Sequence, residues 1–151
     1  MSSNKRKRKS GSAETLVTLT SRKPQWAYLH LELFSTSDSI AKASSALMAL
    51  DPLTVKTYLT AALSQYLGLS GTAIPVDILK IGSRLGQSDG KCVWIRVPYE
   101  DAAAVTAAMS SWIGTDSGAG SSNVAWRVVS RRSHLGALVG GSGKELFIPE
   151  T

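Results

Sequence analysis

The chain of 151 residues contains a single cysteine, Cys92, so no disulfide framework can form within it. Because a free cysteine is usually buried, we interpret Cys92 as a structural thiol in a reducing compartment rather than as a reactive group. There are only two histidines, His30 and His134, which are too few for a histidine metal cluster and give no convincing Ser-His-Asp triad. These scarcities argue against a disulfide-rich domain, a zinc enzyme and a triad hydrolase.

Long apolar runs are also absent. No stretch approaches the roughly 18 apolar residues that a membrane-spanning helix needs, and no apolar segment follows the basic start as it would in a signal peptide. We therefore expect neither a membrane span nor a secretory leader. The hydrophobic fraction of 43% is nevertheless typical of a globular protein, and the length suits one domain.

Outside one short basic segment, the chain has little excess positive charge. The formal net charge is +6, but five of the 17 Lys and Arg residues stand in the block KRKRK. The rest of the chain has 12 basic and 11 acidic residues, so the body of the protein is nearly neutral. A block of like charges stays solvated, and we interpret it either as a nuclear address or as an arm that contacts RNA phosphates. A tail without a specific partner is the third alternative.

Apolar–polar alternation predicts strands. In QWAYLHLEL, alternate residues from Ala27 to Leu33 are apolar, and the other face carries Trp26, Tyr28 and His30. In CVWIRV, the apolar face is opposite the face of Trp94 and Arg96. We expect four strands, over residues 25–33, 73–81, 92–97 and 124–132.

Two helix starts are marked by proline. Asp51-Pro52 combines an acidic N-cap with a proline at the first helical position, and Gly68 is placed to end that helix. Pro98 is predicted to open a second helix, with Glu100 and Asp101 in its first turn. The buried stripes expected from the helical period are Val55, Leu59, Ala62, Leu63 and Tyr66 in the first helix, and Val105, Ala108, Met109 and Trp112 in the second.

The order strand, helix, strand, strand, helix, strand predicts an α+β fold. It is the βαββαβ pattern of ferredoxin-like and RRM-like sandwiches, in which two helices cover one face of a four-stranded antiparallel sheet. We divide the chain into a flexible basic tail over 1–23, the βαββαβ domain over 24–132 and an irregular C-terminal extension over 133–151. Residues 16–19 (LVTL) could add an edge strand, and 35–50 a loop or a short extra helix.

Two glycine-rich motifs resemble ligand-binding loops but do not match them. GGSGKE lacks two features of a phosphate-binding P-loop, because Leu138 stands where the first glycine belongs and Glu145 where Ser or Thr should follow the lysine. GLSG, from Gly68 to Gly71, has the G-x-x-G form of a KH domain, yet it joins a helix to a strand and carries no basic residue. We interpret GLSG as a corner, and no catalytic constellation assembles elsewhere.

The sheet face without helices is the candidate contact surface. Tyr28 and Trp94 stand where an RRM places the aromatic residues that stack on RNA bases, with Arg96 nearby. Trp, Tyr and Arg are equally the residues enriched at protein interfaces, and a nearly neutral body favours a protein partner over RNA. Packing of Trp26 and Trp94 under the C-terminal segment is the structural alternative.

Longer stretches of the chain resemble a known family. ALSQYLGLSGTAIPVDILKI followed by CVWIRVPYEDAAAVTAAMSSWIG, with PQWAYLHLEL and LDPLTVKTYLTAAL upstream, is similar to the small protein subunits of eukaryotic ribonuclease P and RNase MRP, in particular the fungal POP-series subunit eight family, which is related to the subunit five family. The resemblance runs from about Gln25 to Gly114. The segment from Ser35 to Ala49, the KRKRK tail and the part after Arg132 depart from it.

This resemblance implies a non-catalytic role in a particle whose RNA removes the 5′ leader of precursor tRNA or cuts precursor rRNA. It further implies a nuclear, and within the nucleus nucleolar, location, no cofactor, no metal, no small-molecule ligand, and pairing with a sibling subunit of the subunit five type. On that basis the expected protein contacts are Trp26, Tyr28, Trp94 and Arg96, and the expected RNA contacts are Lys5, Arg6, Lys7, Arg8, Lys9, Arg127, Arg131 and Arg132. The competing interpretation is a free-standing single-stranded RNA-binding module of RRM type.

Overall fold

The computed structural model describes residues 23–35, 50–82, 91–115 and 123–139. The elements in these ranges are β1 (Trp26–Ser35), α1 (Pro52–Leu67), the 3-10 helix η2 (Gly68–Ala73), β2 (Asp77–Gly82), β3 (Cys92–Pro98), α2 (Ala102–Ser111), β4 (Ile113–Thr115), β5 (Asn123–Arg132) and α3 (Leu135–Val139). The KRKRK block, LVTL, most of the 35–50 segment and all of GGSGKE lie outside the described residues.

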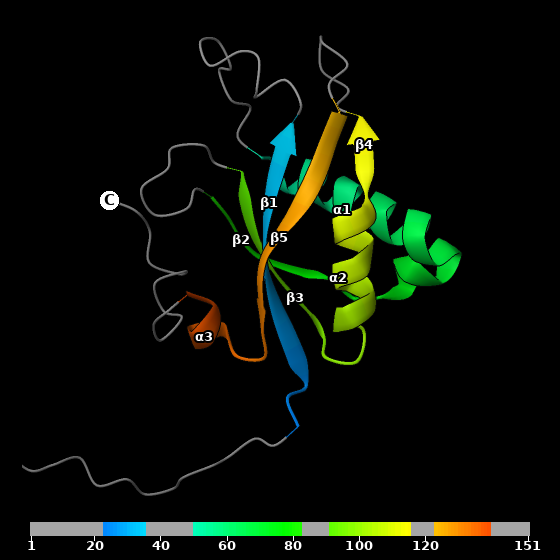
Figure 1. Ribbon diagram of the computed structural model, residues 1–151. Helices are drawn as coiled ribbons and strands as arrows, with labels where there is room; N and C mark the ends of the chain where they lie inside the picture. Colours follow the sequence, from blue (N-terminus) through cyan, green and yellow to red (C-terminus); the bar gives the residue numbers. More distant parts are fainter. Residues whose placement is uncertain (1–22, 36–49, 83–90, 116–122, 140–151) are drawn as a thin grey trace, which may run out of the picture.

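The strands form one antiparallel sheet in the order β2-β3-β1-β5-β4. Helices α1 and α2 cover one face of this sheet, and the short α3 lies on the opposite face (Figure 1). The α+β sandwich expected from the sequence is therefore confirmed, with five strands in the described residues instead of four. The additional strand β4 pairs with β5 at one edge, where the sequence had suggested only a loop beginning at Gly114.

The core lies between the sheet and α1 and α2. The alternation of β1 buries Leu29 and Leu31 completely, and β3 contributes Val93 and Ile95 to the same layer. The helices contribute the expected stripes, of which Val55, Leu59, Ala62, Leu63, Val105, Ala108, Met109 and Trp112 are buried. Burial of a side chain of this size stabilises the fold by about 1.5–3 kcal/mol.

The start of α1 agrees with the sequence, whereas the start of α2 does not. The Asp51 carboxylate accepts a hydrogen bond from the backbone N–H of Leu53 at 3.0 Å, as an N-cap residue does. Pro98 instead ends β3, where it pairs with Trp26, and α2 begins only at Ala102. Glu100 and Asp101 therefore precede the helix in a turn rather than occupying its first turn, and that prediction was wrong because strand pairing extends through the proline.

Two further expectations need correction. Tyr66 was placed in the buried stripe of α1 but is 52% exposed, because in the last turn of α1 its neighbour Leu67, four residues after buried Leu63, is the side chain that packs against the core. Residues 133–151 were expected to be irregular, but their described part contains α3, five residues long. The prediction that Gly68 ends α1 is confirmed. Its φ of 68° is positive, a conformation that favours glycine, and its backbone N–H donates to the Ser64 carbonyl.

Candidate protein and RNA contact surface

The sheet face opposite α1 and α2 carries one row of polar and aromatic residues across four strands. Tyr28 on β1 pairs with Arg96 on β3 and with Arg132 on β5. Arg96 in turn pairs with Asp77 on β2. Since residues directly opposite each other on adjacent strands project from the same face, these four side chains belong to one row. We call Trp26, Tyr28, Asp77, Arg96 and Arg132 the open-face row, since Trp26 borders it on β1.

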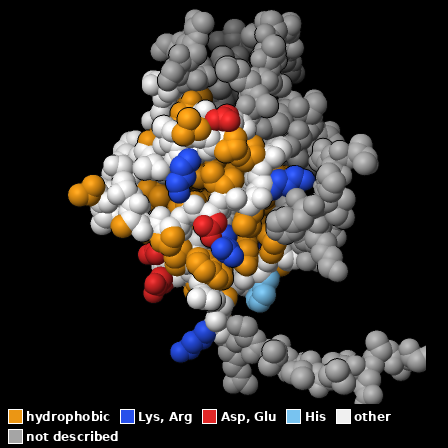
Figure 2. Space-filling view, turned by 180° about the vertical axis from the view of Figure 1, so that it is seen from behind, with side chains coloured by type: hydrophobic (Ala, Val, Ile, Leu, Met, Phe, Trp, Pro, Cys, Tyr) orange, Lys and Arg blue, Asp and Glu red, His pale blue; other side chains and the backbone are white. Residues whose placement is uncertain are grey.

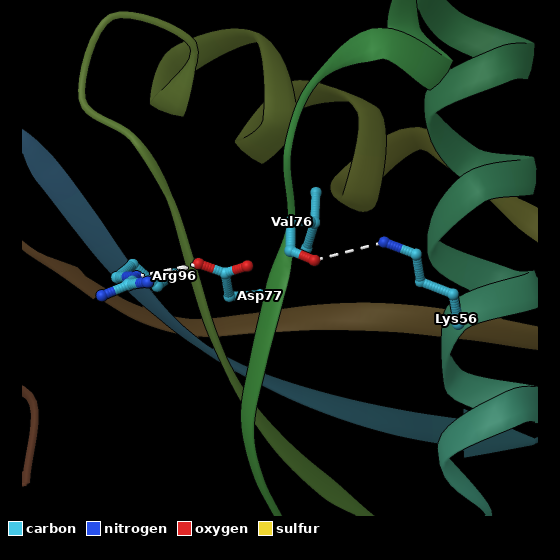
Figure 3. Close-up of polar contacts among 4 residues, drawn as sticks. All are labelled: Lys56, Val76, Asp77 and Arg96. Carbon is cyan, nitrogen blue, oxygen red and sulfur yellow. Dashed lines mark hydrogen bonds and ion pairs between the residues drawn. The ribbon is translucent and has the colours of Figure 1, made fainter.

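Arg96 is held in place from two sides. Its Nε and Nη2 donate to the same carboxylate oxygen of Asp77 at 3.0 and 2.6 Å, and its guanidinium lies 4.5 Å from the centroid of the Trp26 ring. Figure 3 shows Arg96 and Asp77 pointing toward each other, while Lys56 of α1 donates to the Val76 carbonyl at 3.2 Å on the helix side. These contacts fix the arginine as a flat cationic surface next to an aromatic ring.

The energy of the Arg96–Asp77 pair is modest. The two side chains are 37% and 46% exposed, so water screens their attraction. Pairs of this kind contribute roughly 0–1 kcal/mol to stability. Their partial exposure leaves Arg96 able to contact another molecule, and the cation–π contact with Trp26 orients it without neutralising it.

The other half of the sheet face is covered by α3. Trp94 stacks on His30 with ring centroids 4.5 Å apart and an interplanar angle of 9°, and Leu135 and Leu138 pack on the cluster from above. Trp94 is consequently only 8% exposed and Cys92 is buried beside it. Trp94 therefore packs under the C-terminal segment, which was the structural alternative to a contact role. Trp26, Tyr28 and Arg96 stay accessible.

The basic residues of β5 differ in how much of their charge is available. Arg127 lies 3.5 Å from the Glu32 carboxylate and over the Phe34 ring at 5.3 Å, although its side chain is 63% exposed. Arg131 and Arg132 at the end of β5 are exposed. The Arg132 guanidinium donates one hydrogen bond to the Arg131 carbonyl at 3.0 Å, out of the five N–H donors that an arginine carries.

The surface around this face is mixed. Seen from behind the view of Figure 1, hydrophobic side chains surround a small number of charged side chains of both signs (Figure 2). Phosphate binding would require grouped positive charge, whereas alternation of apolar patches with single charges is common at protein interfaces. A protein contact suits this view better than RNA stacking does.

The described ranges show neither a metal site nor a membrane-spanning helix. No group of three or more His, Cys, Asp or Glu in them could hold a metal ion. None of the helices described there is both long and apolar enough to cross a membrane. With Trp94 under α3, an RRM-type stacking surface of Tyr28 and Trp94 would also require α3 to leave the sheet.

Sequence reasoning missed two contributors to the surface. Asp77 was treated as decoration of an edge strand, but strand register makes it the partner of Arg96. The α3 segment was missed because five residues are too few for a helical period to show. Asp77 and Arg96 are 19 residues apart in the sequence, so no local signal could have paired them.

Comparison with known proteins gives the same family as the sequence motifs. The family model described as the ribonucleases P/MRP protein subunit Pop8 matches residues 25–112. A chain in the cryo-electron microscopy structure of yeast ribonuclease MRP matches with a TM-score of 0.60 and 24% sequence identity, over 77% of this chain and 79% of that chain. No curated protein sequence matches significantly. At this identity the structural match concerns the fold alone, whereas the family model covers more than half of the chain.

Proposed function

This chain belongs to the Pop8 family of ribonuclease P/MRP protein subunits, and from that membership we propose how it serves the particle. Catalysis in these ribonucleoproteins is carried out by RNA, so the chain is not itself an enzyme. We propose that it supports removal of the tRNA 5′ leader and processing of rRNA by bracing a sibling subunit and the catalytic RNA. The observation that carries this proposal is the family match over residues 25–112.

The proposed protein contact is the accessible part of the open face. Trp26, Tyr28 and Arg96 combine a large apolar area with a cation that is already oriented by Asp77. Such residues are enriched among those that dominate binding energy in interfaces. The proposed partner is a sibling subunit of similar fold, of the POP subunit five type. Trp94 contributes indirectly, since its packing under α3 shapes the neighbouring surface.

The proposed RNA contacts lie where positive charge is available. They are the tail residues Lys5, Arg6, Lys7, Arg8 and Lys9, and the β5 residues Arg127, Arg131 and Arg132. Each neutralised phosphate adds a salt-dependent increment to binding. A nuclear location, and within the nucleus a nucleolar one, follows from the same proposal, with KRKRK as a candidate import signal.

The test is affinity purification of the tagged full-length chain from its native cells, with and without ribonuclease. Recovery of the RNase P and MRP RNAs together with sibling subunits is the expected result, and a protein that survives ribonuclease treatment is the direct partner. Recovery of scattered messenger RNAs without any sibling protein would refute the proposal and favour a free-standing RNA-binding module.

A further inference from the structure

An apolar side chain is almost fully exposed at the C-terminal end of α1. Leu69, the second residue of η2, is 86% exposed, and Tyr66 in the preceding turn is 52% exposed. Figure 1 shows η2 at the outer end of α1, away from the strands. A single exposed leucine on a surface needs no explanation, so the significance of Leu69 depends on how rigidly its backbone is held and on which residues surround it.

The backbone that carries Leu69 is fixed by several contacts. The hydroxyl of Ser70 donates to the Leu67 carbonyl at 2.9 Å, and that of Thr72 donates to the carbonyl of Leu69 itself at 2.7 Å. Gly71 is buried with its Cα against the Leu63 carbonyl, so close that a Cβ would overlap that oxygen. The turn is therefore tied to α1 on both sides of Leu69. A side chain on such a turn loses little backbone freedom when it enters a pocket.

The segment around Leu69 carries no charge. The 20 residues between Lys56 and Asp77 contain no Asp, Glu, Lys or Arg. The Lys56 ammonium, at the border of this segment, donates to the Val76 carbonyl. RNA binding needs cations to neutralise phosphates, and attachment to an anionic membrane surface needs basic residues around the apolar ones. Depletion of charge around aliphatic and aromatic side chains is the composition of a protein interface core.

We infer that Tyr66 and Leu69 form a second protein-docking surface, separate from the open face, which inserts Leu69 into an apolar pocket of an uncharged protein surface. The occupant is another protein of the same particle, and in this respect the inference rests on the proposed function. The chain then links two protein neighbours, one on its sheet and one at the end of α1.

The experiment places the photo-crosslinking amino acid p-benzoylphenylalanine at position 69 in the tagged full-length chain, in native cells. The matched control carries it at position 53, because Leu53 is also a highly exposed leucine, at 74%, but lies at the opposite end of α1. In parallel, Leu69→Asp and Leu53→Asp are purified and the co-purifying proteins quantified. Burial of one leucine side chain corresponds to a loss of about tenfold to a hundredfold in affinity when it is removed.

The inference expects a ribonuclease-resistant crosslink from position 69 to one protein of the particle and none to that protein from position 53. It also expects Leu69→Asp to lose that protein, while Leu53→Asp retains it. Three results would overturn the docking surface alone. They are a crosslink to RNA, which ribonuclease digests, a crosslink within the chain or to a second copy of it, and equal recovery of the protein by both variants. Failure of the unmodified chain to recover any particle component would overturn the proposed function as well.

Discussion

Two glycines of the GLSG corner should resist substitution for different reasons. Gly68 has a φ of 68° and a ψ of −154°, a region that residues with a Cβ almost never occupy, although no described residue beyond its two chain neighbours lies within 4 Å of where its Cβ would be. Gly71 has no positive φ, but its Cβ would overlap the Leu63 carbonyl and come within 2.9 Å of the Leu67 Cβ. Backbone strain limits the first position, and lack of space limits the second.

The expected costs follow from these two causes. Forcing a side chain into the conformation of Gly68 costs about 1–3 kcal/mol. Adding a methyl group to the filled space at Gly71 costs about 1–3 kcal/mol as well, because backbone atoms of α1 must move. Gly82 is the matched control, since its added Cβ would meet only the flexible end of Lys80 at 3.6 Å and its φ is not positive. Gly82→Ala should change stability by less than about 0.5 kcal/mol.

The assay is urea unfolding of the purified full-length chain and its three Gly→Ala variants, followed by tryptophan fluorescence. With a urea dependence of about 1–3 kcal/mol per molar, a loss of 2 kcal/mol moves the midpoint by roughly 1 M. Gly68→Ala and Gly71→Ala should both move it down, and Gly82→Ala should not. If Gly71→Ala unfolds at the wild-type midpoint, η2 is not packed tightly against α1, and Leu69 is then not held rigidly.

Three other outcomes test the remaining structure. Asp51→Ala should cost about 1 kcal/mol in urea unfolding, because α1 loses its N-cap acceptor; an unchanged midpoint would contradict the cap. Leu59→Ala, at a fully buried position, should cost about 2–5 kcal/mol, whereas the same change at exposed Leu53 should cost less than about 0.5 kcal/mol; equal losses would place α1 in the wrong rotation. Leu138→Ser should weaken the cover over Trp94 and increase acrylamide quenching of the fluorescence; identical quenching would show that α3 does not cover that ring.

The sequence predicted the elements whose signals are local. The Asp51-Pro52 start, the Gly68 end and the alternation in β1 depend on neighbouring residues only, and all three are found in the structure. Pro98 was misassigned because a proline at the end of a strand and one at the start of a helix look alike without the pairing to Trp26. Periodicity predicted the buried face of α1 as far as Leu63, but in the last turn it selected Tyr66, whereas Leu67 is the residue that packs against the core.

The contact surface was less predictable for a related reason. Alternation placed Tyr28, Trp94 and Arg96 on one face, which the register confirms. It could not show which part of that face another segment covers, because α3 returns to the sheet through a contact distant in sequence. The result divides residues that looked equivalent: Trp94 lies under α3, while Tyr28 and Arg96 stay accessible.

Charge separates the surfaces of this protein in a way that constrains how it can sit in a particle. Among the described residues of α1, η2, α2 and β4, Lys56 is the only charged side chain, whereas the sheet face and the strand ends carry most of the other charges. An uncharged helix layer offers phosphates no cation, which agrees with our proposal that RNA contacts the end of β5 and the basic tail. The surfaces that we propose for protein neighbours are then the accessible part of the open-face row and the end of α1. Because the body of the chain is nearly neutral, it has few cations to offer RNA, and we therefore propose that its assembly draws mainly on protein contacts.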